Sequence, residues 1–225
     1  MRRPARLLFP LLLLLVSACS TVPFPATELT PAPPRTAAEL SGGLWNSGSG
    51  SLLIRQSALF ELKGMRVPIT GIMKLDLATR SARLVGMNDM GVKLYDISVD
   101  PAKSRANFVV PELAGYPGFT EAVALSVRRI FLEPVPAADD ALTLSRSSYR
   151  LSRESADATL GFLFGGARAQ LLEKTCRGKG CSWRVRYYQY QQQQGNLFPG
   201  GIVLDDDRAG YRLTLWIESV DKTDE

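Results

Sequence analysis

The stretch YRLTLWIESV, residues 211–220, decides the fold class because its apolar and polar side chains alternate. Positions 211, 213, 215 and 217 are apolar, whereas positions 212, 214 and 218 are polar. A period of two is typical of a β-strand that buries one face and exposes the other. We therefore expect a strand here, with one face turned toward a core.

The same alternation recurs along most of the chain. It is found at residues 52–62, 67–77, 81–88, 91–99 and 103–110, and again at 141–154, 157–165, 167–176, 181–193, 201–206 and 209–220. Short turns separate most of these segments, which favours antiparallel neighbours joined in sequence order. The sequence thus predicts a mainly β (α+β) fold with eleven strands in an antiparallel meander.

One segment follows a helical period instead. Its apolar or small side chains fall at i, i+3, i+4, i+7, i+8, i+11 and i+12: Phe119, Ala122, Val123, Ser126, Val127, Ile130 and Phe131. That spacing places them on one stripe of an α-helix over residues 119–132, bounded by Pro117 and Pro134. The helix must lay its stripe on the sheet, either as a plug in an ordinary core or as a lid over a cavity for an acyl chain.

The N-terminus predicts export and lipidation. Three arginines precede the apolar run 7–16, which is too short to span a bilayer of roughly 30 Å and marks residues 1–18 as a signal peptide. Val16 to Cys19 resembles a lipobox, so Cys19 is expected to carry acyl chains such as palmitate. An ordinary signal peptide cut near Ala18 is the alternative. Ser20 resembles the residue that follows the cysteine in lipoproteins sent to the outer membrane, facing the periplasm.

These signals divide the chain. We expect a signal peptide at 1–18, the lipidated Cys19 with a Pro- and Gly-rich tether at 19–49, a folded domain at 50–221 and a tail at 222–225. Removing residues 1–18 takes away three arginines and no acids, so the net charge falls from +5 to 5 − 3 = +2. A nearly neutral chain gives no reason to expect nucleic acid as a partner. A monomer is expected.

After Cys19, two cysteines remain. Cys176 and Cys181 flank the loop RGKG between two alternating segments, where a hairpin brings the flanking positions within disulfide reach. An oxidising periplasm favours the bond, and a pair of free thiols is the alternative.

The composition argues against an enzyme. The chain has no histidine, which excludes Ser-His-Asp and Cys-His nucleophiles and the usual zinc sites. Three consecutive acids at 205–207 lack the ligand spacing of a calcium loop and favour a solvated turn. The Gly pairs 165–166 and 200–201 lack the strand-to-helix context of phosphate loops. No catalytic residue, metal site or cofactor is expected.

Four segments, in order, resemble the lipoprotein receptor and carrier family of LolB and LolA. Residues 83–91, RLVGMNDMG, resemble the receptor's strand and protruding loop, and Trp183, Arg184 and Val185 followed by tyrosines resemble a second strand. The helix at 119–132 lies at the position of a helix in the receptor, and the segment 199–220 resembles the receptor's C-terminal hairpin. The resemblance implies an eleven-stranded unclosed β-barrel with a helical lid over an apolar cavity that binds acyl chains.

The resemblance also implies site residues and partners. A cavity would be lined by apolar faces, which we expect at Ile54, Phe60, Ile69, Met73, Phe108, Phe119, Val123, Val127, Phe131, Phe162, Phe164, Val185 and Leu215. Met90 takes the place of the leucine that puts cargo into the membrane, and Asp89 takes the place of a proline. Expected partners are the membrane, an acyl chain, lipid or lipoprotein cargo, and a periplasmic carrier protein.

Plainer interpretations stay open. The lining residues could form a packed core, Met90 could be half-buried in a turn, and Tyr187, Tyr188, Tyr190 and Gln191 to Gln194 could be a strand rim. The receptor has two or three helical segments over its opening, whereas only one helix is clear in this sequence. This fits a separate branch of the family better than the receptor itself. If the interior is filled, the alternative function is that of a structural or interaction lipoprotein, which carries no ligand.

Overall fold

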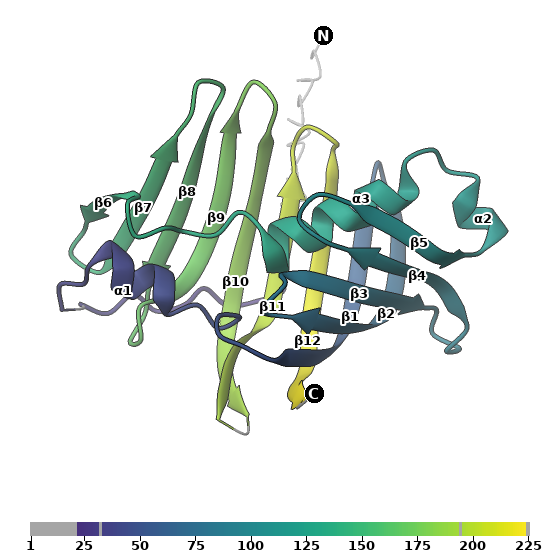
Figure 1. The fold of residues 1–225 in the computed structure, drawn as a ribbon, viewed down its shortest axis with the longest axis horizontal. Coiled ribbons are helices and arrows are strands. Elements are labelled where there is room, and N and C mark those ends of the chain that lie inside the picture. Colours follow the sequence, from purple (N-terminus) through teal and green to yellow (C-terminus); the bar gives the residue numbers. More distant parts are fainter. Residues whose placement is uncertain (1–21, 32, 194, 224–225) are drawn as a thin grey trace, which may run out of the picture.

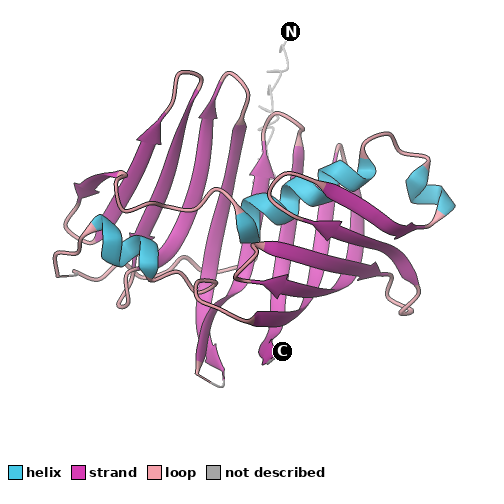
Figure 2. Ribbon diagram, in the orientation of Figure 1, coloured by secondary structure: helices cyan, strands magenta, loops and turns pink. Residues whose placement is uncertain are grey.

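The computed structural model describes residues 22–31, 33–193 and 195–223, which form one twelve-stranded sheet with helices on one side (Figures 1 and 2). Its strands are β1 (Ser51–Leu62), β2 (Met65–Asp76), β3 (Ser81–Met87), β4 (Lys93–Val99), β5 (Ser104–Val109), β6 (Ala141–Leu144), β7 (Ser148–Glu154), β8 (Ala158–Gly165), β9 (Gln170–Gly178), β10 (Ser182–Gln193), β11 (Asn196–Asp206) and β12 (Tyr211–Thr223). The predicted signal peptide and Cys19 lie outside the described residues.

The strand order is β5-β4-β3-β2-β1-β12-β11-β10-β9-β8-β7-β6, and the paired strands run antiparallel. β1 and β12 therefore pair in the middle, while β5 and β6 form two open edges. This confirms the expected unclosed antiparallel sheet. It holds one strand more than predicted because the segment 141–154 is a hairpin, whose turn is closed by the Ser145 N–H donating to the Ser148 carbonyl.

The link from β5 to β6 must cross the sheet because it joins opposite edges. It contains α2 (Pro111–Ala114), α3 (Phe119–Val127) and the π-helix η1 (Arg128–Leu132). We call α3 and η1 together the covering helix; Figure 1 shows it lying across the face of the sheet. Its bounds, 119–132, are those that the apolar stripe predicts, but its last turn is π-helical. No helix in the described part of the chain has both the length and the apolar character to cross a membrane.

The face of the sheet under the helices, the inner face, carries the core. Buried side chains alternate along every central strand, as at Ile54 on β1, Met73 on β2 and Val185 on β10, each 0 % exposed. Ala124, Val127 and Ile130 of the covering helix belong to the same apolar cluster. Full burial of a Val, Ile or Met side chain stabilises the fold by about 2 kcal/mol. Because these side chains belong to one cluster, the helix and the sheet form a single core.

Residues 22–31 and 33–42, which the prolines predict to be part of a tether, contact the domain; we call them the N-terminal strap. Phe24 is 7 % exposed and packs on Tyr188, Val203 and Trp216 of the opposite, outer face. The strap then passes to the inner face, where the Tyr149 hydroxyl donates to the carbonyl of Pro33. This part of the chain is therefore bound to both faces of the sheet.

The strap ends in α1 (Ala37–Gly42), a short helix that begins with a capping box. The Thr36 hydroxyl accepts from the Glu39 N–H at 3.2 Å, and the Glu39 carboxylate accepts from the Thr36 N–H at 2.7 Å. Leu40, 2 % exposed, inserts into the main core. A capping box satisfies backbone donors that a free helix start would leave unpaired, which stabilises so short a helix.

Candidate functional site

Most residues predicted to line a cavity lie on the inner face or on the covering helix, where they form one packed cluster. Eight are buried, with 4 % exposure or less: Ile54, Met73, Val127, Phe131, Phe162, Phe164, Val185 and Leu215. Ile69, Phe119 and Val123 are partly buried against the same cluster. Phe60 is half-buried, and its ring lies 5.5 Å from that of Tyr211.

Phe108 is the exception and corrects the prediction made for it. It is 40 % exposed, and the centroid of its ring lies 4.7 Å from the Nζ of Lys93. The cause is a bulge: Ile97 pairs with Ala106 but Asp96 pairs with Phe108, so Asn107 is an extra residue in β5. One extra residue reverses the alternation, which the sequence pattern alone does not reveal.

The C-terminal end of the covering helix is held by polar side chains. The Lys174 ammonium donates to the carbonyls of Arg129 and Ile130, both at 3.3 Å, and the Tyr187 hydroxyl donates to that of Ile130 at 2.8 Å. Asn46, from the loop before β1, donates to the carbonyl of Phe131 at 2.6 Å. A helix end leaves its last carbonyls without intrahelical partners, and here the sheet and a loop supply them.

Two further contacts secure the side of the covering helix. Arg129 forms an ion pair with Asp206 at 2.5 Å, and both side chains are largely buried. The hydroxyls of Ser126 and Tyr211 lie 2.9 Å apart. The covering helix is thus fixed through specific polar atoms as well as through its apolar stripe.

Lys174 is an unusual residue for the inner face of a sheet because it is only 2 % exposed. Burial, followed by the nearby charge of Arg80, lowers its pKa to about 7. Desolvation disfavours the charged ammonium, so the carbonyls that it contacts compensate only part of the cost of burying it. This hydrogen-bonded contact is therefore sensitive to pH near neutrality.

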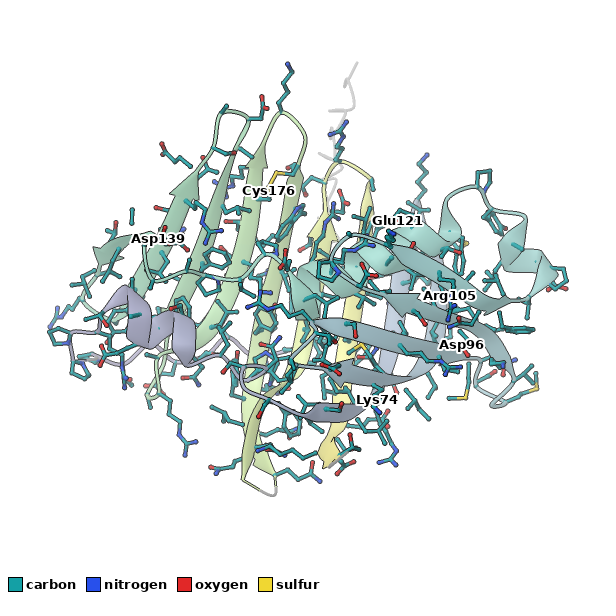
Figure 3. All side chains as sticks on the ribbon, viewed as in Figure 1. Lys74, Asp96, Arg105, Glu121, Asp139 and Cys176 are labelled. Atoms are coloured by element: carbon teal, nitrogen blue, oxygen red, sulfur yellow. A yellow bond between two sulfur atoms is a disulfide. The ribbon has the colours of Figure 1, made fainter. Side chains whose placement is uncertain are left out.

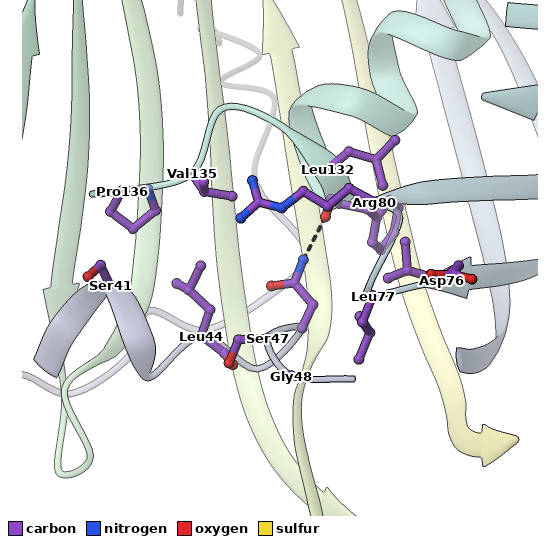
Figure 4. Close-up of a pocket in the computed structure, with 13 residues that line it drawn as sticks. Ser41, Leu44, Ser47, Gly48, Asp76, Leu77, Arg80, Leu132, Val135 and Pro136 are labelled. Atoms are coloured by element: carbon purple, nitrogen blue, oxygen red, sulfur yellow. Dashed lines mark hydrogen bonds between the residues drawn. The ribbon is translucent and has the colours of Figure 1, made fainter. Parts of the chain in front are cut away.

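A cavity of about 130 Å³ opens beside the end of the covering helix (Figure 4). One wall comes from the loop after α1, with Leu44 and Ser47, and the other from Phe131, Leu132 and Val135. Its floor is apolar at Leu75 and Leu77, and Arg80 stands at its rim, paired with Glu133 at 3.4 Å. Ligand pockets for acyl-sized molecules are typically 300 Å³ or more, so the opening is smaller than its ligand would be.

Side chains of the covering helix pack against side chains of the sheet below it. Val127, Ile130 and Phe131 belong to the same cluster as the sheet residues below them. The described residues therefore form a closed arrangement, with an apolar face under a helix and a small opening at its end.

The loop between β3 and β4 presents an apolar tip. Met90 is 79 % exposed and Val92 is 54 % exposed, so Met90 is not half-buried in its turn. The Asn88 side chain accepts from the N–H groups of both residues, at 3.1 and 2.9 Å. This fixes the loop, and Gly91 supplies the positive φ of 77° that the turn requires.

Other predicted features take structural roles. Cys176 and Cys181 form a disulfide across the β9–β10 turn, with Cα atoms 5.8 Å apart, as expected. Among the described residues, no group of three or more cysteines and acids is placed to hold a metal ion. Each of the three acids at 205–207 has a partner: Asp205 contacts Arg186 and Arg212, and Asp207 accepts from Ser182.

The tyrosines of β10 are core residues rather than a rim. Tyr187 and Tyr188 are 2 % and 9 % exposed, and the half-buried Tyr190 donates to the carbonyl of Leu171 at 2.6 Å. Burial raises the pKa of Tyr187 and Tyr190. Gln191, Gln192 and Gln193 continue the strand toward an exposed end, and Gln194 lies outside the described residues.

Sequence reasoning missed Lys174, Asn46 and Asn88. A signal existed for Lys174, because it stands two positions before Cys176 and so shares the inward phase of β9. Asn88 opens a turn, a common role for asparagine. Nothing local distinguishes Asn46, whose partner lies 85 residues away.

Comparison with solved structures supports the fold. A LolA superfamily protein from Nitrosomonas europaea superposes with a TM-score of 0.54 at 8 % identity, covering 85 % of this chain and 96 % of that one. An outer membrane lipoprotein-sorting protein domain from Vibrio parahaemolyticus gives 0.48 at 7 % identity, covering 79 % and 88 %. A DUF1329 family protein from Desulfovibrio piger gives 0.47 at 7 %, covering 84 % and 94 %.

No protein-family model matches the sequence, and no curated protein matches it. The fold of this chain is similar to that of the LolA superfamily protein from Nitrosomonas europaea, as the resemblance in its sequence predicts.

Proposed function

We propose that this chain is a lipid-anchored protein of the outer membrane, facing the periplasm, that binds an acyl chain between its sheet and its covering helix. It acts as a receptor or carrier of lipoprotein or lipid and catalyses no reaction. One observation carries the proposal: much of the apolar inner face is covered by the covering helix, which belongs to the segment that connects the two edges of the sheet, rather than by a second sheet.

The physical basis is that an acyl chain can replace the covering helix on the apolar inner face. Moving the helix away would expose side chains that pack against it, such as the ring of Tyr95 against that of Phe119, at about 25 cal/mol per Å² of apolar area. An acyl chain entering from the opening near Val135 would cover the same surface, so the open state is stabilised only when cargo is present. The closed arrangement then corresponds to the empty protein.

The membrane contact follows from two features. Lipid on Cys19 would stand five residues before Phe24, which is fixed to the sheet, so the anchor reaches at most about 18 Å from it. The exposed tip at Met90 and Val92 is suited to entering the lipid surface when cargo is released. A periplasmic carrier protein would deliver that cargo to a monomeric receptor.

The packing of the covering helix on the sheet also supports a second function. A non-catalytic structural or interaction lipoprotein of the envelope would need no cavity, and the packing of Val127 and Phe131 on the sheet suits it. The two functions differ in whether an acyl chain can displace the covering helix from the sheet.

A fluorescent fatty acid titrated into the Cys19→Ser chain tests the proposal. Val135→Trp places a large ring at the mouth of the opening, and Leu144→Trp places the same ring on an exposed edge strand as the matched control. We expect saturable uptake by the parent chain and by Leu144→Trp, with uptake slowed at least tenfold by Val135→Trp. No uptake by the parent chain, while a known carrier takes up the probe, would favour the interaction protein.

A second test concerns the loop. Met90→Glu should leave the fold intact but reduce transfer of bound cargo to vesicles, since a charge resists entry into lipid. Leu144→Glu, on a surface away from the loop, should transfer normally. Equal transfer by both variants would remove Met90 from the mechanism.

A further inference from the structure

We propose that the outer face of β2 to β5 is a binding site for a phosphate ester. A groove of about 640 Å³ runs across these strands, on the face opposite to the acyl site. It is lined by four cations, Lys74, Arg83, Lys103 and Arg105, and by two carboxylates and three serines. Only Asp76 also borders the opening at the end of the covering helix, and none of the four cations does, so the inference is independent of the proposed acyl binding.

The cations are aligned by strand register. Lys74 pairs with Arg83, Arg83 with Ser98, and Ser98 with Arg105, so the four side chains form one row across four strands. The row is about 14 Å long, from three interstrand spacings of about 4.8 Å. Figure 3 shows the labelled Lys74 and Arg105 on the same part of the molecule, with Asp96 beside them.

Two like charges directly opposite each other normally destabilise a strand pair, and here Lys74 faces Arg83. Asp96 offsets the charge of Arg83, and the two cations lie side by side on this face. The sheet holds both at fixed positions, so an anion would bind without first ordering a loop.

Arg83 is held in an orientation that leaves donors available. Its Nε and Nη2 atoms donate to the two carboxylate oxygens of Asp96 at 2.9 and 2.7 Å, which leaves Nη1 for a ligand. Asp96 is 5 % exposed, and the hydrogen bond from Arg83 lowers its pKa to about 2. A guanidinium fixed on one edge by an ionised carboxylate is well placed to bind phosphate oxygens with its other edge.

The carboxylates that line the groove are engaged in their own turns. Asp76 accepts from the Thr79 N–H at 2.8 Å, and Asp100 accepts from the N–H groups of Ala102 and Lys103 at 2.8 and 2.6 Å. These contacts lower the pKa of both acids and hold them at the groove's end. The centre of the row is left to Arg83, Ser98 and Arg105.

Ser98 adds a neutral donor at that centre. Its hydroxyl oxygen accepts from the Asn107 amide at 2.9 Å, so its own proton can be donated to a ligand. The next row on this face carries the exposed apolar side chains of Ile72 and Phe108, 37 % and 40 % exposed. These two side chains are the ends of a row that also holds Val85 and Asp96. Cations and a hydroxyl with exposed apolar side chains nearby fit a phosphate ester with an apolar portion, from a lipid headgroup or a soluble phosphate ester.

The test uses the Cys19→Ser chain and two variants of equal charge change. Lys103→Gln with Arg105→Gln removes two exposed cations of the groove. Arg146→Gln with Lys179→Gln removes two exposed cations from distant turns as the control. Glycerol phosphate is titrated by NMR at low salt. We expect saturable shifts around Ser98, weakened at least tenfold in the groove variant and less than twofold in the control.

Vesicles identify the source of the phosphate. Those containing phosphatidylglycerol are compared with vesicles of equal negative charge made with oleate, which lacks phosphate. Groove-dependent binding to the first alone indicates a lipid headgroup, and binding of glycerol phosphate without a vesicle preference indicates a soluble ester. The proposal is overturned if the parent chain shows no saturable binding of glycerol phosphate, or if the groove and control variants bind it equally. Uptake of the fatty acid should be the same in both variants.

Discussion

The N-terminal strap and the covering helix both close the sheet, but they are attached in different ways. The strap is fixed at Phe24 on the outer face and at Leu40 on the inner face, through apolar burial and a capped helix. The covering helix lies on the inner face alone, and its last carbonyls depend on Lys174, Tyr187 and Asn46. A segment held on both faces resists removal, whereas one held on a single face can be exchanged for another apolar group that covers the same surface.

Among substitutions in the N-terminal strap and at the contacts of the covering helix, we expect the largest loss of stability at Phe24. Phe24→Ala removes a ring packed against Tyr188 and Trp216, so we expect the free energy of unfolding in urea to fall by about 3 kcal/mol. Leu144→Ala, at an exposed position, should change it little. Fatty-acid uptake should be preserved because the covering helix is untouched, and a stability equal to that of the parent chain would contradict a fixed strap.

Lys174→Met should change how stability depends on pH. The folded pKa of about 7 lies below the unfolded value of about 10.5, so between these pH values the unfolded chain binds a proton that the folded chain has lost. Stability must then rise with pH, by about 2 kcal/mol between pH 7 and pH 9.

Urea unfolding across that range measures the effect. The parent chain and Lys179→Met, in an exposed turn, should show the rise, and Lys174→Met should not. A rise of the same size in Lys174→Met would mean that another group carries it.

Tyr187→Phe tests whether a hydrogen bond to the covering helix has a different effect from a hydrogen bond within the sheet. It removes the hydroxyl that donates to the carbonyl of Ile130 and should cost about 1 kcal/mol. Tyr190→Phe removes a comparable bond, to Leu171 within the sheet, and should cost a similar amount. Only Tyr187→Phe should speed fatty-acid uptake in a stopped-flow measurement, and equal uptake rates would show that the bond does not restrain the helix.

The smallest effect is expected at the start of α1. Thr36→Ala loses the capping box and should lower the free energy of unfolding by at most about 1 kcal/mol. Glu39→Gln keeps an acceptor for the Thr36 N–H and should cost less. Hydrogen exchange of the α1 amides checks both, and unchanged protection in Thr36→Ala would show that Leu40 alone holds the helix.

Local pattern predicted much of the fold. Alternation at residues 52–62 and 211–220 identified strands with one buried face, and the stripe at 119–132 gave the bounds of the covering helix. The cysteines flanking RGKG predicted their own disulfide because the bond closes within one hairpin. Each of these features depends on neighbours a few residues apart.

The candidate site was only partly predictable, because its contacts depend on long-range register. The inward phase of Ile54, Met73 and Leu215 follows from alternation, but the bulge at Asn107 turned Phe108 outward. No local pattern shows how closely the helix packs on the sheet, since this depends on how well side chains from distant strands fit together.

The sequence by itself therefore determined the alternating strands, the amphipathic helix and the hairpin disulfide, since each is a property of local periodicity. Only the tertiary structure decided that the strap binds both faces, that Lys174 meets the end of a helix 44 residues earlier in the chain, and that Lys74, Arg83 and Arg105 form one row. These arrangements join segments far apart in the chain, and their register is set by the packing of the whole sheet.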